Sequence, residues 1–336
     1  MSEAVGHEVL TVRGLRTTYE FRGKPVPAVK DFSLTVRAGE IVGIVGESGS
    51  GKSTVLKSIQ GMHRPPTQVT AEEISLGGRD LRTLSSEEAR KVRGGKMSVI
   101  FQDPINSFNP AWTIGSQFRR VLFLHRPDLK KHEYDEEIIR LLSDVGIEGR
   151  GKLNSYPFQF SQGQLQRIMI AIACASSDLK VLLADEPTTS LDVTIEAQVL
   201  ELLRRLREQR HLGMVLVTHD LSVIAEMCDR VVVMYSGEVV EVADVYDLFE
   251  RPQHPYTEQL LKAIPQFPHD GQRLYAMRGA VPSLDADLPG CPFAPRCDRY
   301  IGDICDSVKP ALSPVPHATE GRAACHLITQ PDLERA

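Results

Sequence analysis

The stretch from Glu40 to Thr54 constrains the fold more than any other part of the chain. An apolar segment, EIVGIVG, leads into GESGSGKST, which begins at Gly46 and fits the pattern G-x-x-x-x-G-K-[ST]. This order predicts a strand, a tight turn and then a helix from about Gly51 to Met62. Backbone N–H groups in such a turn point at phosphates, and glycines let the backbone come close. The sequence therefore predicts a nucleotide-binding α/β protein.

Individual residues of this turn have expected roles. Lys52 would supply a positive charge to the β- and γ-phosphates, and Ser53 would offer its hydroxyl to Mg²⁺. The residues expected to contact the nucleotide are Gly46, Ser48, Gly49, Ser50, Gly51, Lys52, Ser53 and Thr54.

A second apolar strand, VLLAD, is predicted to deliver two carboxylates to the same edge of a sheet. Asp185 and Glu186 stand at its C-terminal end, which is where ligands bind in open α/β sheets. Asp185 would hold Mg²⁺ through water, and Glu186 would polarise the attacking water. The alternative is that these residues only cap the following helix.

Two further polar residues follow predicted core strands. Gln102 comes after MSVIF and could sense Mg²⁺ and the attacking water, and His219 comes after MVLVT and could contact the γ-phosphate. Either residue taken alone would be an ordinary polar residue at a strand end. Their positions after core strands favour the functional interpretation.

The remaining pattern indicates an organisation in two parts. Strands alternating with helices predict a largely parallel sheet, and residues 72–101 are predicted to be rich in strand. Residues of about 103–165 read as an inserted helical subdomain. Proline becomes frequent beyond Phe249, so we expect an ATPase-like domain over 1–249 and an extension over 250–336.

Composition narrows the functional classes. The chain has 39 Lys and Arg against 44 Asp and Glu, a net charge of −5, which argues against a nucleic-acid binder. No apolar run approaches the ~20 residues of a membrane-spanning helix. The segment MSEAVGHEVL has no pattern of a secretory signal, so we expect a cytosolic protein unless a partner holds it at a membrane.

Six cysteines are distributed unevenly. Cys174 and Cys228 lie in apolar or helical contexts and are expected to be buried. The other four lie near the C-terminus, separated by five, seven and nineteen residues: Cys291, Cys297, Cys305 and Cys325. A disulfide framework is not expected in a reducing compartment, so this group suggests a metal or cluster site.

A series of ordered motifs makes residues 8–245 resemble the ATP-binding subunit of an ABC transporter. GESGSGKST looks like the Walker A motif, VLLADEP like Walker B, and Gln102 and His219 like the Q-loop and switch residues. FSQGQ occupies the place of the LSGGQ signature, and TSLD, ending at Asp192, that of the D-loop. Tyr19 is placed like the aromatic residue that stacks on adenine, with Phe21 as an alternative. The resemblance implies a parallel-sheet core with antiparallel β and helical subdomains.

The resemblance also implies a mechanism and partners. Two such domains would enclose two ATP molecules, with the Walker A turn of one facing the signature of the other: Ser161, Gln162, Gly163 and Gln164. Expected Mg²⁺ ligands are Ser53, Gln102 and Asp185. Closure would be transmitted to two membrane permease subunits at the cytoplasmic face of the membrane, where residues 103–117 would dock. An extracytoplasmic solute-binding protein would complete the system.

The tail resembles the C-terminal extension of oligopeptide and dipeptide importer ATPases, through RPQHPYTEQLLKAIP and the cysteines that follow. These cysteines lack the paired C-x₂-C spacing typical of zinc sites, and four thiolates in a loop-rich segment suit a [4Fe–4S] cluster. Zinc and unliganded thiols are the alternatives. Peptides are the expected solute, and the alternative solutes are an oligosaccharide, a nickel chelate or an opine. The alternative functions are that of a soluble ABC ATPase and that of a redox sensor.

Gln162 departs from the signature pattern, which has glycine at this position. Three interpretations are open. The side chain could point away at little cost, it could weaken the composite site that this chain completes, or its amide could itself donate to the nucleotide. The second interpretation implies that the partner ATPase is a different chain with an intact signature.

Overall fold

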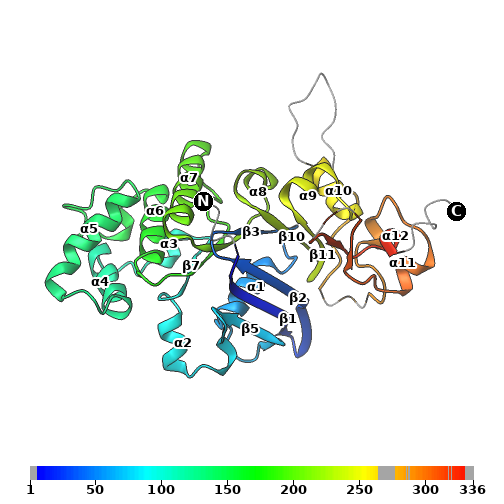
Figure 1. The fold of residues 1–336 in the computed structure, drawn as a ribbon, viewed down its shortest axis with the longest axis horizontal. Helices are drawn as coiled ribbons and strands as arrows, with labels where there is room; N and C mark the ends of the chain where they lie inside the picture. The colour runs from blue at the N-terminus through cyan, green and yellow to red at the C-terminus, as the bar shows by residue number, and fades with distance from the viewer. Residues whose placement is uncertain are drawn as a thin grey trace, which may run out of the picture. The chain divides into compact units, whose positions relative to one another are not determined.

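The computed structural model describes residues 6–263, 277–284, 286, 288–316, 318 and 320–329 (Figure 1). The chain divides into two compact units, which are described separately. The first comprises Met1–Thr11, Thr35–Glu40 and Ile74–Leu216, and the second comprises Val12–Leu34, Ile41–Glu73 and Val217–Ala336.

The second unit contains strands in the order β1–β2–β11–β10–β3. Strand β10 runs parallel to β3, with Arg230 opposite Val42, and antiparallel to β11. Its strands are β1 (Glu8–Phe21), β2 (Lys24–Arg37), β3 (Ile41–Val45), β4 (Gln68–Thr70), β10 (Arg230–Tyr235), β11 (Glu238–Asp244), β12 (Ser313–Pro314) and β13 (Arg322–Ala323). Its helices are α1 (Lys52–Ile59), α8 (Leu221–Met227), α9 (Val245–Glu250), α10 (Pro255–Lys262), η4 (Ala294–Arg296), α11 (Asp303–Ser307) and α12 (His326–Thr329).

The first unit contains the strand order β9–β8–β7, with β7 and β8 parallel. Its strands are β5 (Glu73–Leu76), β6 (Arg79–Asp80), β7 (Met97–Ile100), β8 (Val181–Asp185) and β9 (Gly213–Val217). Its helices are α2 (Ser86–Val92), α3 (Pro104–Ser107), α4 (Ile114–His125), α5 (Tyr134–Asp144), α6 (Gln162–Ala173) and α7 (Val193–Arg210), with short 3₁₀ turns η1 (Leu81–Thr83), η2 (Lys131–Glu133) and η3 (Pro157–Gln159).

The spacing of apolar residues along the sequence explains why these elements form. All five residues of β3 and all five of β8 are buried, as expected for central parallel strands. Helix α7 instead buries one stripe, which is made of Val199, Leu200, Leu202, Leu203 and Leu206. Parallel strands with covered faces place their C-terminal ends at one edge, so the polar residues after β7 and β8 lie close together.

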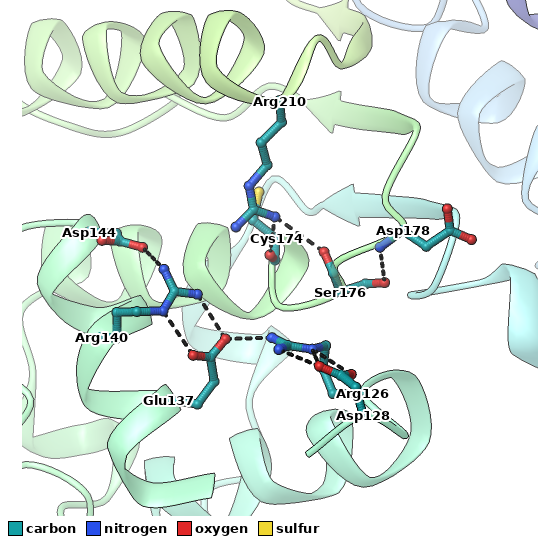
Figure 2. Close-up of polar contacts among 9 residues, drawn as sticks. All are labelled: Arg126, Asp128, Glu137, Arg140, Asp144, Cys174, Ser176, Asp178 and Arg210. Carbon is teal, nitrogen blue, oxygen red and sulfur yellow. Dashed lines mark hydrogen bonds and ion pairs between the residues drawn. The ribbon is translucent and has the colours of Figure 1, made fainter. Parts of the chain in front are cut away.

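Ion pairs fasten the helical part of the first unit (Figure 2). Arg126, which follows α4, and Arg140 on α5 both contact Glu137, and Arg140 also pairs with Asp144 at 2.8 Å. Arg210, the last residue of α7, donates from Nη1 to the carbonyl of Cys174, the C-cap of α6, at 2.6 Å. Helices α3, α4 and α5 lie within residues 103–165, the range in which the sequence predicts a helical subdomain.

One expectation about the elements needs correction. Residues 72–101 are not uniformly strand-rich, because α2 lies between β6 and β7. Its start was recognisable, since Ser85 and Glu88 form a capping box in which Glu88 Oε2 accepts from the Ser85 N–H at 3.0 Å.

Across the described ranges, every helix is too short or too polar to cross a bilayer.

Candidate nucleotide-binding site

The turn after β3 has the backbone geometry that a phosphate needs. Gly46 and Gly51 both have positive φ angles, of 156° and 101°. A Cβ atom at Gly46 would lie 2.1 Å from the Met234 carbonyl oxygen, and one at Gly51 would lie 2.5 Å from that of Ala28. Only glycine fits these two positions, so the loop requires the residue type that the motif specifies.

Helix α1 begins directly after this turn and presents its N-terminus to it. Its N-cap, Gly51, provides no side-chain hydrogen bond, and its first turn contains no acidic residue. An uncapped helix N-terminus is a site for an anion, because its N–H groups have no intrahelical acceptor.

Lys52 is held over the turn by the loop itself. Its Nζ donates to the Gly46 carbonyl at 2.7 Å and to the Glu47 carbonyl at 3.0 Å. The side chain is 5% exposed, so its charge is partly desolvated. A buried ammonium in this place is suited to binding phosphate.

Other residues of the turn differ in exposure. Ser48 and Gly49 are exposed, whereas Ser53 and Thr54 are half-buried. Ser50 is buried, and its Oγ has no hydrogen-bond partner among the described residues. Tyr19 Oη lies 3.2 Å from Thr54 Oγ1, which places this tyrosine beside the turn, while Phe21 is 62% exposed.

The end of β8 brings together the residues expected to act on water. Gln102 Nε2 donates to Glu186 Oε2 at 2.8 Å, and Thr189 Oγ1 donates to the same oxygen at 2.9 Å. Glu186 has a φ angle of 46°, a conformation that non-glycine residues rarely adopt. Strained backbone of this kind is concentrated at functional sites, where surrounding contacts maintain it. Sequence reasoning missed Thr189, because its only signal is its place in the turn after Glu186.

The signature segment forms a pre-ordered helix N-terminus. Ser161 Oγ accepts from the Gln164 N–H at 3.3 Å, and Gln164 Oε1 accepts from the Ser161 N–H at 3.0 Å. Gly163 is required for packing, since a Cβ there would lie 2.8 Å from Ile195 Cγ2. Gln162 is the first residue of α6 and is half-buried.

The D-loop and switch residues lie in turns that lead into helices. Asp192 caps α7, accepting from the Ile195 N–H at 3.0 Å. His219 is exposed in the turn between β9 and α8. Asp220 caps α8, and its carboxylate accepts from the Ser222 N–H at 2.7 Å.

The candidate residues thus fall into two groups. The first unit holds Gln102, Asp185, Glu186, the signature and Asp192; the second holds Tyr19, the phosphate-binding turn and His219. The proposed Mg²⁺ ligands Ser53, Gln102 and Asp185 offer hydroxyl, amide and carboxylate oxygens, which is the donor chemistry that this ion prefers.

The four C-terminal cysteines line one cavity in the second unit. Cys291, Cys297, Cys305 and Cys325 share it with apolar residues and with His254 and His326. All four are free thiols. Their segments are connected, because the Cys291 N–H donates to the Cys305 carbonyl at 2.8 Å. The two remaining cysteines, Cys174 and Cys228, are buried as expected.

The chemistry of these thiols follows from burial. Desolvation raises the pKa of Cys291 to about 12 and that of Cys297 to about 11. Ligation would therefore displace protons from them. In the described parts of the chain, no three His, Cys, Asp or Glu side chains are arranged as ligands of a metal ion.

Comparison with known proteins identifies the family. The profile described as ABC transporter matches residues 29–189, and the profile described as oligopeptide/dipeptide transporter, C-terminal region, matches residues 240–305. The dipeptide transport ATP-binding protein DppD of Escherichia coli (strain K12) is 41% identical over 319 residues, which cover 95% of this chain and 96% of the relative. This chain belongs to the ABC transporter family.

Other similarities agree with this assignment. The oligopeptide transport ATP-binding protein AppD of Bacillus subtilis (strain 168) is 42% identical over 98% of this ABC subunit and 99% of the relative. The solved dimer of the ATP-binding cassette MJ0796 bound to ADP and Pi matches with a TM-score of 0.62 and 30% identity, over 70% of this chain and 98% of that chain. The expected ABC-type α/β fold and ATP-binding class are confirmed.

Proposed function

We propose that this chain is the energy-coupling ATPase subunit of a binding-protein-dependent importer for dipeptides or oligopeptides. The observation that carries the proposal is the hydrogen-bonded group of Gln102, Glu186 and Thr189, in a chain whose similarity to peptide-transporter ATPases extends over its tail. We divide the chain into an ATPase domain, 1–249, and an extension, 250–336.

The residues of the chain account for ATP hydrolysis as follows. Lys52 and the N-terminus of α1 bind the phosphates, and Tyr19 contacts the adenine. Glu186 accepts a hydrogen bond from the attacking water and raises its nucleophilicity, while Gln102 and Thr189 fix the carboxylate by bonding to one of its oxygens. His219 contacts the γ-phosphate. Ser53, Gln102 and Asp185 would hold Mg²⁺, which would supply positive charge for the phosphate oxygens.

The signature acts on a second ATPase subunit. The N-terminus of α6, with Ser161 as its cap, faces the γ-phosphate bound by the partner. We infer that the partner is a different chain with a glycine in place of Gln162, and that Gln162 slows hydrolysis in the site that it completes.

Replacing Gln162 with glycine in the assembled complex tests this inference. The Ser161–Gln164 capping box does not use the side chain of Gln162, so the helix should still form, at a cost of up to ~1 kcal/mol. We expect ATP turnover to increase severalfold. Unchanged turnover would contradict the inference.

The helical insertion provides a surface for the permease subunits. Ile105, Trp112 and Phe158 are 57%, 40% and 75% exposed, an unusual arrangement for large apolar side chains. Two permeases would dock here, which would hold the chain at the cytoplasmic face of the membrane.

Purification of the tagged protein from its native membranes, in mild detergent and without oxygen, tests these partnerships. Mass spectrometry should identify two permeases and a second ATPase with an unbroken LSGGQ. Permeases accompanied by this ATPase alone would contradict the unequal-site inference, and the absence of any membrane protein would contradict the importer.

We also propose that Cys291, Cys297, Cys305 and Cys325 hold a [4Fe–4S] cluster. They line one cavity, which supports a common ligand. A cluster is larger than one ion and is bound by four separated thiolates. The cluster would tie the loops of the tail together.

Iron and acid-labile sulfide analysis of anaerobically purified protein checks this proposal. About four of each per chain are expected, and a Cys305→Ser variant should lose most of both. Cys228→Ser, which changes a buried cysteine outside this cavity, should retain them. Stoichiometric zinc, or no metal in the wild-type protein, would overturn the cluster assignment.

A further inference from the structure

Arg296 is a buried cation that none of the nucleotide motifs includes. It lies in η4, immediately before Cys297, and its side chain is 4% exposed. Its guanidinium binds Glu47 in a bidentate manner, with Nη1 2.6 Å from Oε2 and Nη2 3.0 Å from Oε1. Paired hydrogen bonds of this type fix both partners in position as well as neutralising their charges.

Glu47 is the second residue of the phosphate-binding turn. Its N–H donates to Tyr256 Oη at 2.9 Å, and its carbonyl accepts from Lys52 Nζ at 3.0 Å. The same carbonyl accepts from the Ser50 N–H at 3.1 Å. One residue therefore connects the tail, through Arg296 and Tyr256, with the lysine expected to bind phosphate.

Residues of the tail and Tyr235 of β10 hold Arg296 in place. Nε donates to the Arg278 carbonyl at 2.8 Å, and Nη1 donates to Tyr235 Oη at 3.1 Å. The guanidinium carbon lies 5.7 Å from the ring centroid of Tyr235 and 6.0 Å from that of Phe293. A cation fixed by this many contacts differs from the mobile ion pairs of a protein surface, which contribute little.

We propose that Arg296 is a positioning residue for ATP binding, and that it acts through Glu47. A carboxylate in a turn that binds phosphates repels the triphosphate unless a cation neutralises it. Arg296 removes this repulsion and fixes the turn in the conformation that its glycines allow. The inference rests on the proposed binding of ATP by this turn, and it gives the tail a role in nucleotide affinity.

The first test is an equilibrium titration of the full-length protein with a non-hydrolysable ATP analogue and Mg²⁺. Arg296→Met should weaken binding about tenfold, a value within the usual range for coupled charge pairs. The matched control is Lys309→Gln, which removes a tail cation paired with Glu238 at 2.8 Å, outside the turn, and should leave affinity unchanged. Equal affinity of wild type and Arg296→Met would overturn the inference. Failure of the wild type to bind the analogue would instead overturn the proposed ATPase function.

A second substitution separates positioning from mere stability. In the Arg296→Met background, Glu47→Gln removes the unpaired negative charge, so most of the lost affinity should return. If the double variant bound the ATP analogue as weakly as Arg296→Met does, that result would contradict action through Glu47, whatever the melting temperatures of the two proteins. Should Arg296→Met fail to fold, Arg296→Lys keeps the charge but loses the paired geometry. It should weaken binding about threefold, within the same range, and unchanged affinity would contradict the proposal.

Discussion

Replacing Glu186 with glutamine is expected to lower ATP turnover of the assembled transporter at least about 100-fold, the usual contribution of a general base. The amide retains the size of the side chain but cannot draw a proton from water. Gln102 and Thr189 contact this side chain through one oxygen, so its place after β8 should be kept. ATP binding should remain close to that of the wild type.

Steady-state hydrolysis and nucleotide binding measured on the same preparation check this expectation. Glu201→Gln is a suitable control, because Glu201 lies on α7 and pairs with Arg204 at 2.6 Å. Turnover of Glu186→Gln within a few-fold of the wild type would show that another residue activates the water.

Replacing Lys52 with methionine is expected to weaken ATP binding about 100-fold, which corresponds to the loss of a desolvated charge contact. Lys52 is 5% exposed, and its ammonium is held by two carbonyl oxygens of the turn. Methionine preserves much of the apolar stem, so the change acts mainly on the charge.

Direct titration with the ATP analogue measures this loss. Lys57→Met provides the control, since Lys57 is an exposed lysine in the last turn of the same helix. If the two variants bound nucleotide equally well, Lys52 could not be the phosphate ligand.

Local parts of the site could be predicted from the sequence because their geometry is specified by neighbouring residues. The glycines at 46 and 51 leave no room for a side chain, and Ser161 and Gln164 satisfy each other within one helical turn. Such features are visible as a motif in a few consecutive residues. The alternation of strands and helices likewise indicated the α/β fold.

Long-range contacts were not accessible in this way. Glu47 and Arg296 are far apart in the chain, and no sequence pattern around either residue predicts their ion pair. The contact of Tyr256 with the Glu47 N–H was missed for the same reason, although the segment containing it was recognised as part of the tail. The strained conformation of Glu186 is also invisible in the sequence, because tertiary contacts maintain it.

Peptide uptake by proteoliposomes containing the purified complex is the most direct test of the central claim. With the solute-binding protein outside and ATP inside, labelled dipeptide or oligopeptide should accumulate in the lumen, and the Glu186→Gln complex should accumulate none. Uptake of an oligosaccharide, a nickel chelate or an opine in place of peptides would contradict the assigned solute. ATP hydrolysis that moves no solute would contradict the assignment of this chain as the energy-coupling subunit of an importer.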